Sequence, residues 1–147
     1  MNELTELYQE LLLDHSKRPP HYGSIDDPSR VATGHNPLCG DQITVYLKHE
    51  GDRLVTVCFT GQACAICTAS ASLMTNQLTN STWDEADQLI SRVHHMLTQE
   101  DGVVADTMGE LGALAGVHRF PMRVKCATLP WHTVLAALRG EDQTSTE

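Results

Sequence analysis

The chain has 147 residues, 41% of them hydrophobic, and a formal net charge of −9 at pH 7. This length suits one domain around one hydrophobic core, so we expect a single domain over residues 1–147. Only ten lysines and arginines are present, which argues against partners such as nucleic acid or an anionic membrane. No apolar run approaches the roughly 20 residues that span a bilayer. The N-terminus carries acids rather than a basic signal region, so we expect a cytoplasmic protein whose partner is a protein or an ion.

The first predicted element is a helix. Apolar residues recur at helical spacing from Leu4 to Leu12, which predicts about four helical turns ending before Pro19-Pro20. Residues 21–36 are rich in Gly, Pro, Asp and Ser and predict a connecting stretch, within which Arg30-Val31-Ala32 is a candidate short strand.

Two β signals follow. Alternating apolar residues at 43, 45 and 47 predict one strand, and residues 54–59 predict another, so we expect an antiparallel hairpin. After Gly61 the chain lacks Gly and Pro as far as Leu78 and is rich in Ala, Leu and Met. This composition predicts a helix that begins near Cys64.

The second half is predicted to be helical. Thr82 and Glu85 fit a capping box for a helix unit that ends at Gly102. Residues 99–118, with a short helical stretch over 108–115, read as an insertion. A last helix is expected between Phe120-Pro121 and Gly140, and residues 141–147 are expected to form a disordered polar tail. The fold class is therefore α+β, with a small antiparallel sheet of about three strands packed against several α-helices.

Five cysteines stand at positions 39, 58, 64, 67 and 126. An odd number in a chain without an export signal argues against a disulfide framework and favours metal or thiol chemistry, although any free cysteine can simply fill the core. Cys39 lies at a turn, just before Gly40-Asp41. Cys64 is predicted at a helix N-terminus, which stabilises a thiolate, and Cys126 is predicted just before the last helix.

Three thiolates and a carboxylate, from Cys39, Cys64, Cys126 and Asp41, would complete a tetrahedral shell suited to zinc. Iron can use the same thiolates, as it does in iron–sulfur clusters. The carboxylate of Asp41 is the hardest donor of the four, so we expect it to leave most readily when sulfur or a partner side chain enters. The residues alone leave open whether these cysteines form a site or are inert core residues.

Three motifs in chain order resemble the U-type iron–sulfur cluster assembly proteins. They are NPLCGD at 36–41, GQACAI at 61–66 with ASASLMT at 69–75, and FPMRVKCATL at 120–129. The likeness covers nearly the whole chain. It is closer to the SufU branch than to the IscU branch, because a segment is added before Phe120 and Lys125 stands where IscU-type scaffolds place a histidine.

This resemblance implies a SufE/IscU-like fold with zinc bound by Cys39, Asp41, Cys64 and Cys126. It also implies that Cys39 accepts persulfide sulfur from a SufS-type, pyridoxal-phosphate-dependent cysteine desulfurase. The sulfur would pass to a SufBCD-type scaffold or to apo iron–sulfur proteins. The protein would then be a sulfurtransferase-type acceptor rather than a stand-alone enzyme.

The sequence is also compatible with other functions. One is a scaffold on which a [2Fe–2S] cluster is assembled, with iron or a transient cluster in place of zinc. A structural zinc module or a zinc hydrolase is a more remote alternative. The motifs of zinc deaminases and zinc proteases are absent from the sequence.

Two residues are auxiliary candidates. Cys67 lies three residues after Cys64, on nearly the same helix face, and is either a spare buried thiol or a relay, redox partner or alternative ligand. Arg123 either holds Asp41 and steers anions, or is an ordinary surface charge.

The remaining candidates favour simpler roles. Cys58 alternates within a strand and fits packing, and His35 fits a solvated loop residue. His94 and His95 point to different faces of one helix and therefore cannot chelate an ion together.

Overall fold

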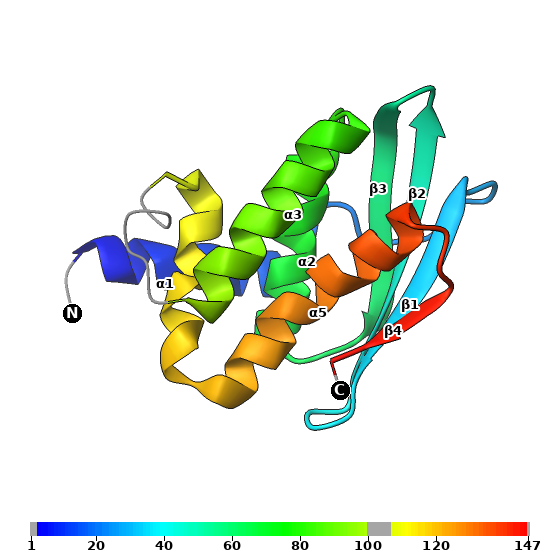
Figure 1. Cartoon of the computed structure of the whole chain (residues 1–147). Helices are drawn as coiled ribbons and strands as arrows, with labels where there is room; N and C mark the ends of the chain where they lie inside the picture. Colours follow the sequence, from blue (N-terminus) through cyan, green and yellow to red (C-terminus); the bar gives the residue numbers. More distant parts are fainter. Residues whose placement is uncertain (1–2, 100–106, 147) are drawn as a thin grey trace.

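The computed structural model describes residues 3–99 and 107–146, and its helices lie to one side of a twisted sheet (Figure 1). The α+β class is confirmed. The elements in chain order are α1 (Glu3–Lys17), β1 (Arg30–Asn36), β2 (Asp41–Glu50), β3 (Arg53–Gln62), α2 (Ala65–Leu78), α3 (Trp83–Thr98), the 3₁₀ helix η1 (Gly109–Arg119), α5 (Pro121–Leu138) and β4 (Gln143–Ser145).

The sheet has the strand order β3-β2-β1-β4. The predicted hairpin of β2 and β3 is confirmed as antiparallel, and β1 pairs antiparallel with the other edge of β2. On β2, the side chains of Ile43, Val45 and Leu47 are buried, while their neighbours are half-buried or exposed. One face of the sheet therefore forms the core under the helices.

The sheet has four strands rather than about three, because β4 forms inside the tail that we expected to be disordered. It pairs in parallel with β1, and hydrogen bonds from Thr33 N to Asp142 O (2.9 Å) and from Thr146 N to His35 O (3.0 Å) extend the pairing. β1 itself is longer than the predicted three residues, since it pairs with β2 along its whole length. These polar segments become strands because neighbouring strands satisfy their backbone groups, which local sequence does not reveal.

The helix predictions hold for the first half of the chain. α1 ends before Pro19, and α2 follows the N-cap residue Cys64. The capping box of Thr82 and Glu85 is present at the start of α3. Gly102, the predicted end of the α3 unit, lies outside the described residues. Among the described residues, no helix is long and apolar enough to cross a membrane.

Two predictions for the second half need correction. The helical stretch expected over 108–115 is longer and is a 3₁₀ helix, η1, over Gly109–Arg119, and it buries Leu111 and Leu114 in the core. Cys126 does not precede the last helix, because α5 already begins at Pro121. Proline is favoured in the first turn of a helix, where its missing N–H costs nothing.

Helix α5 packs against β1, α2 and α3 and so fixes the position of Cys126. The Ser70 hydroxyl of α2 donates to Ala127 O (2.6 Å) and accepts from Trp131 Nε1 (3.0 Å), which joins the two helices through a buried polar bridge. On the other side, Gly34 of β1 leaves room for Thr133, whose hydroxyl a Cβ at position 34 would strike. The backbone of β1 and helix α5 therefore approach each other closely.

Candidate metal centre

Three chain segments bring cysteines together beside the β1–β2 turn. Asn36 ends β1 and Asp41 begins β2, and the two residues pair across the hairpin. The turn between them carries the exposed Cys39 and includes Gly40, whose φ of +71° favours glycine. The other two cysteines arrive on helices, Cys64 as the N-cap of α2 and Cys126 in α5.

The closest contacts join Cys39, Asp41 and Cys126. The two sulfurs lie 3.4 Å apart, and one ligand atom from each of the three residues falls within 4.8 Å of the others. Asn36 Nδ2 donates to Asp41 Oδ2 (3.1 Å) and lies 3.6 Å from Cys126 Sγ. The structure thus gathers three of the four predicted ligands into one compact group.

Cys64 lies against this group but not inside the 4.8 Å set. Its backbone N–H donates to Asp41 Oδ1 at 2.8 Å, and its side chain is among the groups that raise the pKa of Cys126. Its Sγ accepts from the N–H of Cys67 at 3.5 Å, as an N-cap side chain does. The carboxylate of Asp41 therefore sits at the positive end of the α2 dipole, which favours its charge.

Burial divides the centre into an inner and an outer side. Asp41 and Cys126 are 2% and 0% exposed, whereas Cys39 is exposed and Cys64 is half-buried. An incoming group would therefore reach Cys39 first. The inner residues are protected from solvent and held in place.

The electrostatics of the centre favour a bound cation. Burial raises the pKa of the Cys126 thiol, and hydrogen bonding to Cys39, Asp41 and Cys64 raises it further. Three thiols and a carboxylate so close together cannot all ionise without a compensating charge. A divalent metal supplies that charge and displaces the thiol protons, so the donor set fits zinc, with iron as the other metal that binds thiolates.

Asn36 is the residue of the centre that sequence reasoning missed. In the sequence it is only the first residue of the NPLCGD motif, yet it is 0% exposed. Its amide binds Asp41 and Cys126, while its Oδ1 accepts from the Thr146 hydroxyl (3.0 Å) beside β4. A polar residue before proline signals a turn, but only the β4 pairing shows that its side chain is enclosed.

The auxiliary candidates have different positions. Cys67 is fully buried under the centre, and burial together with the charges of Asp41, Cys64 and Cys39 raises the pKa of its thiol. Arg123 is exposed and does not hold Asp41, whose oxygens accept from Asn36 and from the Cys64 N–H.

The other cysteine and the loop histidine lie on strands. Cys58 is half-buried on β3, on the side of the sheet away from the core residues Val57 and Phe59, and burial raises the pKa of its thiol. His35 is half-buried on β1, so it is a strand residue rather than a solvated loop residue. Both are outside the compact metal-binding group.

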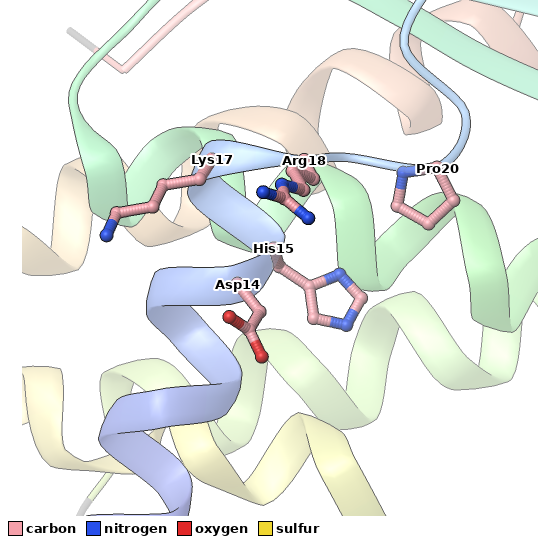
Figure 2. A pocket seen from close by; sticks show the side chains of 5 residues that line it. All are labelled: Asp14, His15, Lys17, Arg18 and Pro20. Atoms are coloured by element: carbon pink, nitrogen blue, oxygen red, sulfur yellow. The ribbon is translucent and has the colours of Figure 1, made fainter.

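A hollow of about 520 Å³ lies at the C-terminal end of α1, away from the cysteines. It is lined by Asp14, His15, Lys17, Arg18 and Pro20, and Figure 2 shows Lys17 extending away from His15 and Pro20. Its basic side chains do not all converge on one point. His15 is also engaged by Ser72, with its Nδ1 2.6 Å from the hydroxyl, so the chemistry of this protein is better sought at the cysteines.

An α+β domain that gathers thiols and a buried carboxylate beside a strand turn has the donor set of a metal-binding protein. Comparisons with known proteins narrow this class. Residues 7–127 match the family described as "NifU-like N terminal domain".

Relatives and a solved structure agree with this match. Iron-sulfur cluster assembly scaffold protein IscU of Streptococcus pyogenes serotype M1 is 36% identical over 139 residues, covering 95% of this chain and 87% of the relative. Zinc-dependent sulfurtransferase SufU of Bacillus subtilis (strain 168) is 34% identical over 139 residues, covering 95% and 94%. The putative SUF-system scaffold protein of Fervidobacterium islandicum AW-1 has a TM-score of 0.81 at 36% identity, covering 90% of this chain and 97% of that one.

The chain therefore belongs to the NifU-like N-terminal domain family, within the IscU/SufU group of iron–sulfur cluster assembly proteins. The resemblance drawn from the three sequence motifs is confirmed at this level.

Proposed function

We propose that this protein accepts persulfide sulfur on Cys39 for iron–sulfur cluster assembly, at a centre where Cys39, Asp41, Cys64 and Cys126 bind zinc. The observation that carries the proposal is the pairing of an exposed thiol with a buried one, 3.4 Å apart, beside a buried carboxylate. The exposed thiol can meet another protein while the buried residues stay fixed. The Bacillus subtilis relative is named a zinc-dependent sulfurtransferase, which supports the same role.

The transfer step balances without an added oxidant or reductant. The sulfur of Cys39 attacks the outer sulfur of a persulfide on a cysteine desulfurase, an S–S bond forms on Cys39, and the donor's S–S bond breaks. The donor cysteine leaves as a thiolate, so the sulfur keeps its oxidation level. Zinc, when bound, would keep the thiols deprotonated and shielded from other reactions.

The residues of the centre have different roles in this step. Asp41 is the only oxygen donor in the set, so it is the ligand that an incoming sulfur displaces most readily. Asn36 and the N–H of Cys64 hold that carboxylate in place before and after the exchange.

A SufS-type, pyridoxal-phosphate-dependent desulfurase is the proposed donor, and a SufBCD-type scaffold or apo iron–sulfur proteins are the proposed recipients. We place this reaction in the cytoplasm, where free thiols persist.

The test combines metal analysis with desulfurase kinetics. Protein purified without added metal should carry about one zinc per chain, as a four-ligand centre predicts. It should raise the turnover of a cognate cysteine desulfurase, and Cys39→Ala should abolish the rise. The matched control is Cys58→Ala, which removes a half-buried thiol outside the centre and should leave the rise intact. If Cys39→Ala stimulates as well as the unchanged protein, Cys39 is not the acceptor.

A scaffold for a [2Fe–2S] cluster is the second candidate, favoured by the name of the Streptococcus pyogenes relative. The same three thiols would serve. Lys125, half-buried and adjacent to Cys126, argues against it, because a protonated lysine cannot bind iron. Anaerobic reconstitution with iron and sulfide should give no stable visible absorbance if sulfur acceptance is the function, and a stable cluster would favour the scaffold instead.

A further inference from the structure

Helices α3 and α5 pack against each other (Figure 1). A groove of about 330 Å³ lies between their side chains. Apolar side chains such as Leu97 and Leu135 line it, together with two histidines, His94 from α3 and His132 from α5. His94 is exposed and His132 is half-buried. Both imidazoles are therefore accessible to solvent and lie beside apolar side chains.

The two rings have a geometry suited to one metal ion. Their centroids lie 5.6 Å apart and their planes are inclined by 72°. Two imidazoles that share an ion at the usual Zn–N distance have ring centres roughly 5 to 6 Å apart. The observed separation of the two ring centres falls within this range.

The ring nitrogens of both histidines are available. Within residues 3–99 and 107–146, no hydrogen bond ties either ring, whereas His15 and His21 are engaged by the hydroxyls of Ser72 and Thr75. Burial, and the charge of His94 next to it, lower the pKa of His132. The neutral imidazole is the form that binds metals.

This groove is separate from the cysteine centre. His132 lies six residues beyond Cys126, which is about 9 Å along the helix axis and on a different face of α5. The chain's net charge of −9 attracts cations to the molecule as a whole.

We propose that His94 and His132 form a second metal site, which binds a divalent cation of the zinc and nickel type through one nitrogen from each ring. Water completes the coordination shell, because the groove is open to solvent. The site is weaker than the cysteine centre, since it offers two protein ligands. It does not depend on the proposed function.

The test uses the full chain with its cysteine centre first saturated with zinc, and Ni²⁺ as the probe. Calorimetry should show one Ni²⁺ bound per chain, and paramagnetic broadening in NMR spectra should centre on residues of the α3–α5 groove. His94→Ala and His132→Ala should each weaken binding at least 10-fold, because a single imidazole remains. His95→Ala, which removes the neighbouring exposed histidine from another face of α3, should leave the affinity unchanged.

Two results would overturn the proposal. One is the absence of Ni²⁺ binding by the zinc-loaded protein. The other is unchanged affinity in His94→Ala, a variant that will fold because its side chain is exposed. Neither result bears on sulfur acceptance at Cys39, which is measured separately by desulfurase turnover.

Discussion

Helix α5 carries the buried member of two pairs of side chains that can bind metals. In the thiol pair, buried Cys126 meets exposed Cys39, and in the imidazole pair, half-buried His132 meets exposed His94. The surroundings of the two pairs differ. Asn36 donates hydrogen bonds to Cys126 of the thiol pair and to the adjacent Asp41, whereas no described residue hydrogen-bonds to the rings of the imidazole pair.

This difference separates a preorganised site from an adaptable one. The thiol pair is held in position before any ion arrives, so little ordering remains when a ligand binds. The imidazole pair must order its rings on binding and should hold an ion more weakly. Four predictions test the contrast, from the largest expected effect to the smallest.

The largest effect is expected from Asp41→Ala, which removes the main support of the thiol pair. Two donors, the buried Asn36 amide and the half-buried Cys64 N–H, lose their carboxylate acceptor, although the amide keeps its contact with Cys126. Each unsatisfied buried donor costs roughly 1 to 3 kcal/mol, so the free energy of unfolding should fall by about 4 kcal/mol. Urea denaturation of the metal-free protein measures this free energy of unfolding.

The matched control is Asp27→Ala. Asp27 forms an ion pair with Lys48 at 3.2 Å, but its side chain is 96% exposed. Its loss should change the free energy of unfolding by less than about 0.5 kcal/mol. An equal response of the two variants would show that Asp41 does not support the centre.

Asn36→Ala should have the next largest effect. It removes the amide that orders Asp41 and Cys126, and it leaves the Thr146 hydroxyl without its acceptor. We expect a loss of about 2 kcal/mol in the free energy of unfolding and a roughly 10- to 100-fold weaker affinity for zinc. Competition with a chromophoric chelator measures the affinity, and Ni²⁺ binding at the imidazole pair should not change.

Gly34→Ala tests the close packing of α5 against β1, on which the positions of both pairs depend. A methyl group at this position would strike the Thr133 hydroxyl and press on Leu129. Overpacking of this kind costs about 1 to 2 kcal/mol, and thermal unfolding measures it. Gly116→Ala is the control, because a Cβ there meets no atom within 4 Å. Equal melting temperatures for the two variants would contradict the close approach of β1 and α5.

The smallest effect concerns pH and the imidazole pair. Burial and the charge of His94 lower the pKa of His132, so the unfolded chain takes up a proton at higher pH than the folded one. The resulting stabilisation is present above the ordinary histidine pKa of about 6.5 and is lost as the pH falls through the lowered value. With a chelator present, stability should decline less between pH 7.5 and 5.5 in His132→Asn than in the unchanged protein. The same decline in both would contradict the shift.

Much of the local structure was predictable from sequence. The helix α1, the capping box at Thr82 and the alternation of β2 have local causes, and each appears where it was expected. The three cysteine motifs also identified the family. β4 was not predictable, because Gln143–Ser145 has no apolar pattern and becomes a strand only where the β1 edge accepts it.

By itself, the sequence determined the helices, the central hairpin, and the thiols and carboxylate that can bind a metal, because these depend on residue type and short spacing. Only the tertiary structure decided which of these side chains meet. It enclosed Asn36, placed Cys126 inside a helix, and paired His94 with His132 rather than with its neighbour His95. Contacts between residues far apart in the chain follow from the packing of whole elements, which no local pattern encodes.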